Sequence, residues 1–203
     1  MLLRPNFAMD APPESITIGG ADYPCETDFR TWIEITLLFR EIIQDADTPQ
    51  HMHHNVEILE KMQEKAFGGI LVDEDPGEVM RAMAEFSRGY PCAPVESADE
   101  NGPDVFSFKW DLNYIIIAIR NQSGIDLSYR RKEKFHWWEF LLEFNTLCGD
   151  HYILNLMEAR GYSGKDKEMI RRKRRCALPV EYTAAEQAEI DAFNAMFEGR
   201  RSE

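Results

Sequence analysis

Basic residues are outnumbered by acidic residues in this chain, and this imbalance limits what the chain can bind. The 203 residues include 23 lysines and arginines against 36 aspartates and glutamates, which gives a formal net charge of −13 at pH 7. Most of such a surface repels phosphate, so the composition disfavours a general coat for nucleic acid. Hydrophobic residues make up 44% of the chain, which is enough for a folded core and argues against global disorder.

Long apolar runs and paired cysteines are also absent. The longest apolar run is the six residues Tyr114–Ile119, whereas a helix that spans a bilayer needs about 20, and no signal peptide is recognised at the N-terminus. The cysteines, Cys25, Cys92, Cys148 and Cys176, contain no C-x-x-C pair and are spread as reduced thiols of cytosolic proteins usually are. We therefore expect a soluble, intracellular protein.

Motifs for phosphate binding and nucleophilic catalysis are missing as well. The chain has no G-x-x-x-x-G-K-[ST], no G-x-G-x-x-G and no G-x-S-x-G sequence. Neither a phosphate-binding loop nor a nucleophile elbow therefore has support. We expect a protein that is not an enzyme, with no catalytic residues, no metal and no cofactor.

The spacing of apolar residues predicts a mainly α fold, a compact helical domain with a small N-terminal β-hairpin. Residues 14–18 alternate in polarity, and Gly19-Gly20 supplies the positive φ angles of a tight turn before Tyr23-Pro-Cys25. Helices with apolar faces follow. The expected ranges are Thr27 (as N-cap) to about Ile43, Thr48 to Gly68 with Met52, Val56, Leu59 and Met62 on its face, and Asp75 to Gly89.

The second half is expected to hold the densest aromatic packing. The helix from Trp110 to about Gln122 is apolar on nearly every side, which is typical of a central core helix. The other ranges are Lys134 to Cys148, Asp150 to Arg160, residues 165–175, and a last helix after a capping box at Thr183-Ala-Ala-Glu186.

Residues 89–103 are the best internal linker, because they contain three prolines, two glycines and an acidic cluster. We therefore divide the chain into three parts. These are an irregular N-terminal segment (1–13), a helical domain (14–180, with a subdomain boundary within 89–104) and a C-terminal helical extension (181–203).

Two polar clusters have both a chemical and a structural interpretation. His51, His53 and His54 could face a metal, but a zinc site needs three or four ligands and second-shell support, so we favour a solvated helix start. His136, Glu139 and Glu143 have the spacing of one helical face and could transfer a proton or bind a metal. We favour the interpretation that they form the polar stripe of an aromatic helix.

The tryptophan pair and the basic tract are the candidates for partner binding. Trp137 and Trp138 point about 100° apart on a helix, so one could anchor an interface, although core packing of both is favoured. Residues 165–175 include seven basic and two acidic residues, and could contact phosphate, an acidic partner or the protein's own acidic surface. The candidate partner-binding residues are Trp110, Trp137, Trp138, Lys165, Lys167, Arg171, Arg172, Lys173, Arg174 and Arg175.

Six short motifs occur in order between residues 14 and 180. They are Ile16-Thr-Ile-Gly19 with Thr27-Asp-Phe-Arg-Thr-Trp32, Phe106-x-Phe108 with Trp110-Asp-Leu-Asn-Tyr-Ile115, Gly124-Ile-Asp-Leu127, His136-Trp-Trp-x-Phe140, Arg160, and Arg171-Arg-Lys-Arg-Arg-Cys-Ala-Leu-Pro179. In this order the chain resembles the bacteriophage gene-product-fifteen family, which siphophage-type genomes encode between the major tail protein and the tape-measure protein. It departs from the family at Cys176, where an aromatic residue is expected, and in its extension after residue 180.

The resemblance implies a non-catalytic tail-assembly chaperone in the cytoplasm of the host bacterium, encoded by a phage or prophage. Such proteins coat the long helical tape-measure protein, keep it soluble, help to recruit the major tail-tube protein and are absent from the finished virion. A shorter tail-chaperone product or a second copy of the chain is a further partner that the resemblance leaves open. The alternative is an accessory protein that binds nucleic acid through residues 165–175. A membrane partner is not expected.

Overall fold

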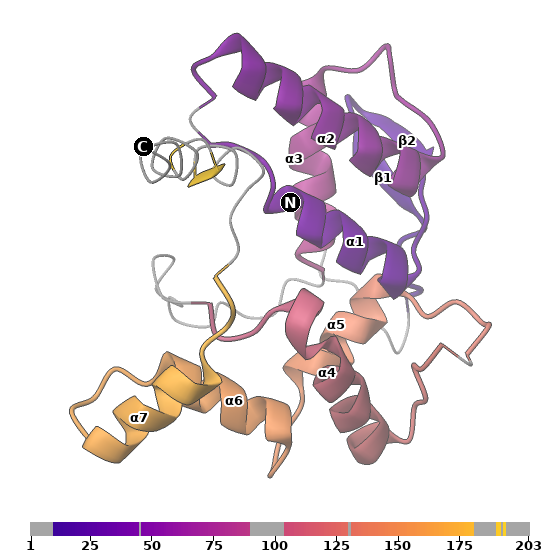
Figure 1. The fold of residues 1–203 in the computed structure, drawn as a ribbon. Helices are drawn as coiled ribbons and strands as arrows, with labels where there is room; N and C mark the ends of the chain where they lie inside the picture. Colours follow the sequence, from indigo (N-terminus) through magenta and orange to yellow (C-terminus); the bar gives the residue numbers. More distant parts are fainter. Residues whose placement is uncertain are drawn as a thin grey trace.

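The protein folds into two groups of helices, with the only described sheet, a two-stranded hairpin, beside the first group (Figure 1). The structure is a computed structural model that describes residues 10–44, 46–89, 104–129, 131–180, 190, 191 and 193. The mainly α fold predicted from the sequence is confirmed. The elements are β1 (Ser15–Ile18), β2 (Ala21–Pro24), α1 (Phe29–Phe39), α2 (Pro49–Phe67), α3 (Pro76–Ser87), α4 (Phe108–Ser123), α5 (Trp137–Asn145), α6 (Tyr152–Gly161) and α7 (Lys167–Cys176).

The hairpin forms where the sequence predicts it. Strands β1 and β2 are antiparallel with Ile18 opposite Ala21, and the two residues between them, Gly19 and Gly20, have φ angles of 57° and 89°. A two-residue turn with positive φ at both positions matches the twist of the strands. Ile16 and Ile18 are buried, and β1 lies against α3, so the hairpin does not have to be stable alone.

Local capping signals set most of the helix starts. Thr48 and Asp75 accept backbone N–H groups at the starts of α2 and α3, as predicted. The predicted cap of α1 is wrong by one residue, because Asp28 and not Thr27 accepts the N–H of Arg30. Helix α1 also ends at Phe39 rather than near Ile43, since Asn55 of α2 binds both the N–H and the carbonyl of Ile43 at 2.9 and 2.8 Å.

The two helix groups are joined where α1 and α5 begin. Asp28 and His136 form an isolated antiparallel bridge, in which the N–H of Phe29 donates to Phe135 O at 2.9 Å and the N–H of Trp137 donates to Thr27 O at 2.7 Å. His136 is therefore extended, and α5 begins at Trp137 rather than at Lys134. It ends at Asn145, not Cys148, because Gln122 of α4 binds the backbone of residues 146 and 148.

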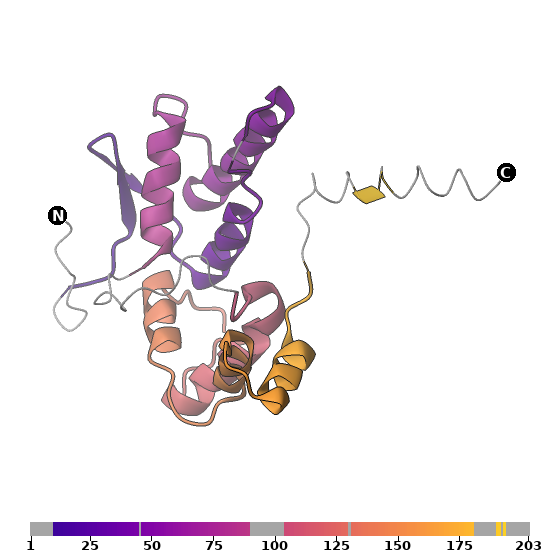
Figure 2. The same cartoon turned by 90° about the vertical axis from the view of Figure 1, so that its left-hand side faces the viewer.

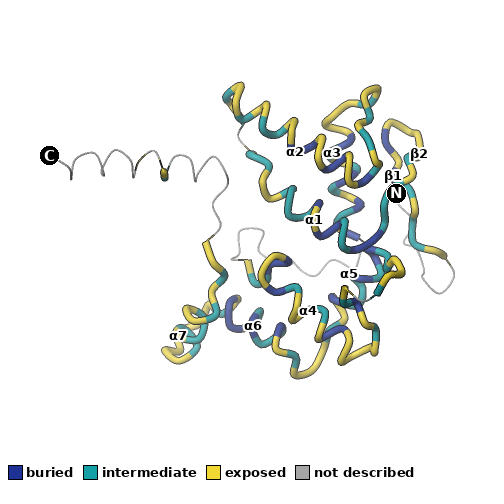
Figure 3. The backbone as a smooth tube through the Cα atoms, turned by 45° about the vertical axis from the view of Figure 1, so that its right-hand side comes forward, coloured by how far each residue is buried: buried dark blue, intermediate teal, exposed yellow. Residues whose placement is uncertain are grey.

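Both tryptophans of α5 are buried at this junction, as favoured from the sequence. Trp137 and Trp138 are 1% and 8% exposed, and their indole N–H groups donate to Ser87 O and Phe86 O at 2.9 and 3.0 Å. These two carbonyls lie in the last turn of α3, where carbonyls lack the usual i+4 donor of the helix, and Phe86 O also accepts the N–H of Gly89 at 3.0 Å. Buried residues gather where α1, α3 and α5 meet (Figure 3), so the aromatic core connects the two groups.

Two predicted apolar faces are only partly buried. Helix α4 was expected to be a central core helix, yet Trp110, Tyr114 and Ile117 are 47%, 41% and 46% exposed. Helix α2 buries Leu59 but leaves Met52 and Val56 about half exposed. Helix α1, with 11 residues, is too short to cover all of α2, which has 19.

A buried arginine connects α4, α6 and the end of α7. Arg160 forms a two-pronged ion pair with Asp111, at 2.6 and 3.1 Å, and the two side chains are 8% and 2% exposed. The same guanidinium donates to Val105 O at 3.1 Å and to Cys176 O at 2.6 Å. The segment that enters α4 and the segment that leaves α7 therefore meet at one side chain.

Several predictions for the linker and for the C-terminal part of the chain lie outside the described residues. The linker from residue 90 to 103 and the capping box at 183–186 are among them, and the proposed domain boundaries stay a prediction. Helix α7 ends at Cys176, two residues before Leu178, and Ile190 and Phe193 have helical backbone. None of the described helices has the length and apolar character that a membrane crossing needs.

Replacing Asp111 with alanine should leave the buried Arg160 charge without its partner. We expect the free energy of unfolding to fall by about 3–5 kcal/mol, the range for one broken half of a buried ion pair, as measured by urea denaturation. Lys65→Ala, which removes the exposed pair with Glu34, is the control and should cost at most about 1 kcal/mol. Equal losses in the two variants would contradict the role of Arg160.

Candidate partner-binding surface

The outward side of α4 is apolar and aromatic. Trp110, Tyr114 and Ile117 follow one another at i, i+4 and i+7, so they lie on one face of the helix. Phe108, Ile115 and Ile119 are buried on the other side, with at most 8% of each residue exposed. Apolar side chains that remain exposed in a row are typical of a surface that binds a partner.

Helix α6 extends this surface with one more aromatic ring. Tyr152 is 59% exposed, and its ring meets Tyr114 edge-on at a centroid distance of 4.9 Å. The ammonium of Lys109 lies 5.5 Å from the centroid of the Trp110 ring, within the range of a cation–π contact. We call Trp110, Tyr114, Ile117 and Tyr152 the α4 face.

Helix α7 presents most of the basic tract to solvent. Lys173 donates to Tyr162 O at 2.8 Å and Arg172 to Asn155 O at 3.5 Å, so these two residues serve the chain's own structure. The other five are exposed and form no ion pair or hydrogen bond with the described residues, so pairing with the protein's own acidic surface has no support there. They are Lys165, Lys167, Arg171, Arg174 and Arg175.

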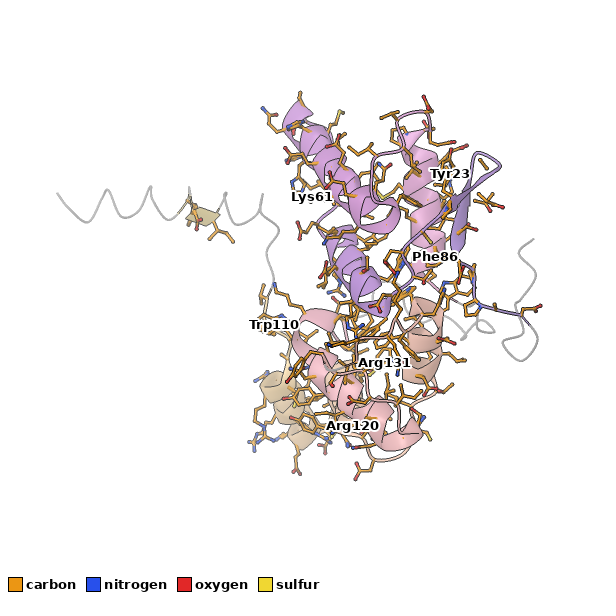
Figure 4. All side chains as sticks on the ribbon, turned by 90° about the vertical axis from the view of Figure 1, so that its right-hand side faces the viewer. Tyr23, Lys61, Phe86, Trp110, Arg120 and Arg131 are labelled. Carbon is orange, nitrogen blue, oxygen red and sulfur yellow. The ribbon has the colours of Figure 1, made fainter. Side chains whose placement is uncertain are left out.

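The α4 face and α7 lie on the same side of the molecule. Figure 4 shows Trp110 on the side where α7 lies, and Figure 2 shows α7 beside α4 and α6 from the opposite direction. The hydrogen bonds of Arg160 explain this arrangement, because they hold Cys176 and Val105 on one guanidinium. Helix α6 packs against both α4 and α7, so it lies between the two helices that carry the apolar and the basic residues.

The structure separates the residues that the sequence proposed for binding. Trp110 and the basic tract lie on this surface, whereas Trp137 and Trp138 are in the core and cannot reach a partner. Tyr114, Ile117 and Tyr152 were not among the candidates. Since α4 is apolar on nearly all sides, the sequence pattern could not show which side faces solvent.

His136 has a structural role that differs from the predicted polar stripe. It is the N-cap of α5: its Nδ1 accepts the N–H of Trp138 at 3.0 Å and its Nε2–H donates to Pro13 O at 2.9 Å. Burial lowers the pKa of His136, against the opposing effects of the Pro13 hydrogen bond and of Glu139 and Glu14. Both ring nitrogens are used within the fold, which leaves neither of them for a substrate.

The histidines near the start of α2 point to different partners. His51 lies 3.5 Å from Asp47, His53 lies 3.2 Å from Glu57, and His54 meets Glu41 O at 3.0 Å. Across the described ranges, no group of three or more His, Cys, Asp or Glu side chains is arranged to hold a metal ion. Burial raises the pKa of the Cys25 thiol to about 12, helped by Glu26 and Glu14, so this cysteine is a poor nucleophile at neutral pH.

Comparison with known proteins gives one match. The sequence model of a family described as Bacteriophage Gp15 protein matches residues 9–179, which is most of the chain. No curated protein and no solved structure gave a significant match. The match ends before the extension that begins at residue 181.

Protonation of His136 should destabilise the fold at mildly acidic pH. Because the pKa of His136 is lower in the folded chain than its ordinary value of 6.5, the unfolded chain takes up the proton first as the pH falls. We therefore expect the free energy of unfolding to decrease as the pH falls below about 6.5, measured by urea denaturation at several pH values.

The matched variant for this test is His136→Asn, which keeps a side chain able to cap α5 but cannot titrate. It should show a smaller decrease between neutral and acidic pH, whereas His53→Asn, which keeps His136, should retain the decrease. If His136→Asn and the native chain lose stability in parallel, His136 is not the responsible group.

Proposed function

The chain belongs to the Bacteriophage Gp15 protein family, and on this premise we propose that it is a non-catalytic chaperone of phage tail assembly that binds the tape-measure protein. The observation that carries the proposal is the exposed α4 face on a helical scaffold. The resemblance described above supports the same role, since it implies a gene next to that of the tape-measure protein.

The shape of the α4 face suits a helical partner. Side chains exposed at i, i+4 and i+7 can pack against the apolar face of an amphipathic helix, which offers anchors at the same spacing. A long helical protein repeats such anchors, so many copies of a weak binder could coat it. Contacts that are weak one by one remain displaceable when tail-tube subunits arrive, while their number maintains coverage.

The basic helix adds selectivity for charge. The exposed cations of α7 attract acidic segments of a partner. The rest of the protein's surface is acidic and repels such segments. Recruitment of the major tail-tube protein, contact with a shorter tail-chaperone product or with a second copy, and action in the host cytoplasm belong to the same proposal. No catalytic step is part of it.

Substitutions in the α4 face should remove the protection of the tape-measure protein. We expect co-expression with the native chain to keep the neighbouring tape-measure protein soluble, and Trp110→Ser/Tyr114→Ser to lose most of this effect, because aromatic anchors often contribute about 2 kcal/mol or more each. The measurement is the fraction of tape-measure protein in the supernatant and its co-purification with the tagged chain.

The matched control is Met52→Ser/Val56→Ser, which changes two apolar residues of α2 that are equally exposed. This variant should protect the tape-measure protein as the native chain does. The proposal fails if the native chain neither co-purifies with the tape-measure protein nor changes its solubility. If both double variants behave alike, the α4 face is not the binding surface.

A second candidate function is nucleic-acid binding, which the exposed cations of α7 favour. Each phosphate contact would contribute a slope of about −0.9 to the dependence of log K on log salt. With a net charge of −13, we expect no salt-sensitive binding of duplex or single-stranded DNA near physiological salt in a fluorescence titration. Steep salt dependence that Arg171→Glu/Arg174→Glu removes would establish this alternative instead.

A further inference from the structure

The connection between α2 and α3 combines exposed apolar residues with carboxylates that lack a cationic partner. Ile70 and Val72 are 43% and 82% exposed. Asp73 and Glu78 are exposed as well, and neither carboxylate forms an ion pair with the described residues. We call residues 70–78, which include the first turn of α3, the acidic loop. It offers both apolar and negatively charged contact area to a partner.

Three hydrogen bonds fix the acidic loop to the elements around it. The buried side chain of Gln63 in α2 accepts the N–H of Leu71 at 2.9 Å, and Tyr23 of β2 donates its hydroxyl to Glu74. Asp75 accepts a backbone N–H in the first turn of α3 at 2.9 Å. A loop that is already held in this way loses little conformational entropy when it binds a partner.

Helix α7 presents the opposite charge along one face. Lys167, Arg171, Arg174 and Arg175 are spaced at i, i+4, i+7 and i+8, so they share one side of the helix, and all four are exposed. None of them forms an ion pair or hydrogen bond with the described residues. Because the aliphatic stems of such side chains can cover apolar groups, this face matches the acidic loop in charge and in apolar contact.

The acidic loop and α7 lie at opposite ends of the molecule. Figure 1 shows the connection between α2 and α3 beside the hairpin at one end and α7 at the other. Figure 4 likewise shows Tyr23, which binds Glu74 of the acidic loop, well away from α7. One chain therefore cannot bring its own two surfaces together, and a contact between them has to join two copies. Since the two surfaces differ, such a contact is heterologous.

We propose that copies of this chain associate head to tail, with the acidic loop of one copy bound to the basic face of α7 in the next. Two chains with a net charge of −13 repel each other, and this orientation brings opposite charges together. Each bound pair retains one free surface of each kind, so further copies can add. The inference does not rest on binding of the tape-measure protein, because the α4 face takes no part in the contact.

Sedimentation velocity of the full-length chain at several concentrations measures this association. At low salt we expect the native chain to form species larger than a dimer as its concentration rises, and to return to monomers near 1 M salt, where the screening length is about 3 Å. A loop variant, Val72→Ser/Asp73→Asn/Glu78→Gln, and an α7 variant, Arg171→Gln/Arg174→Gln, should each remain monomeric. Circular dichroism confirms that both variants keep their helix content.

A mixture of these two variants tests the head-to-tail arrangement itself. The loop variant keeps a native α7, and the α7 variant keeps a native acidic loop, so one contact can form between them and no third copy can add. We therefore expect the mixture to form a dimer with one copy of each variant, although neither variant associates alone. The substitutions neutralise charges rather than reverse them, so the altered surfaces do not attract each other.

Matched controls remove the same charges at exposed positions elsewhere. Glu60→Gln/Glu64→Gln is the control for the loop variant, and Lys61→Gln/Lys132→Gln is the control for the α7 variant. Both should associate as the native chain does, because they leave the acidic loop and the basic face unchanged.

The outcome separates this proposal from the proposed function. Trp110→Ser/Tyr114→Ser, which should lose protection of the tape-measure protein, should still associate head to tail. The proposal is overturned if the native chain stays monomeric at every concentration at low salt, if it stops at a dimer, or if the mixture of the loop and α7 variants stays monomeric.

Discussion

The pairing of two helix starts is the constraint on which the other contacts depend. Asp28 and His136 lie more than a hundred residues apart in the chain, yet they form an antiparallel bridge and each caps its own helix. An N-cap residue is extended, and an extended residue can also pair with a second strand, so the two requirements are met by one backbone conformation. Helices α1 and α5 therefore leave a common point in fixed directions.

That common point decides which side of each later element is buried. Starting α5 at Trp137 carries both indoles to the end of α3, where they bind the carbonyls of Phe86 and Ser87. Helix α4 then packs against α1, α5 and α6, and the aromatic core needs only one of its apolar sides. The opposite side, with Trp110, Tyr114 and Ile117, remains between 41% and 47% exposed.

The sequence was informative where structure is local and silent where it depends on distant contacts. The hairpin, the caps at Thr48 and Asp75 and the end of α2 at Gly68 follow from a few neighbouring residues, and these predictions are confirmed. The starts of α1 and α5 were placed wrongly, because the bridge between them has no local signal. The exposed side of α4 and the approach of Cys176 to Val105 are likewise set by Arg160, whose partners lie 16 to 55 residues away.

The Arg160 network links the stability of the core to the composition of the surface. A buried ion pair contributes little net stability by itself, because desolvation offsets most of the attraction between the charges. Its value here is geometric: the guanidinium has five N–H donors in a planar fork, and it uses them to fix α4, α6 and the end of α7 relative to one another. Apolar residues of the same volume could fill that space, but they could not orient two backbone carbonyls. Helix α6 packs against both α4 and α7, and Arg160 holds the end of α7 close to the segment that enters α4.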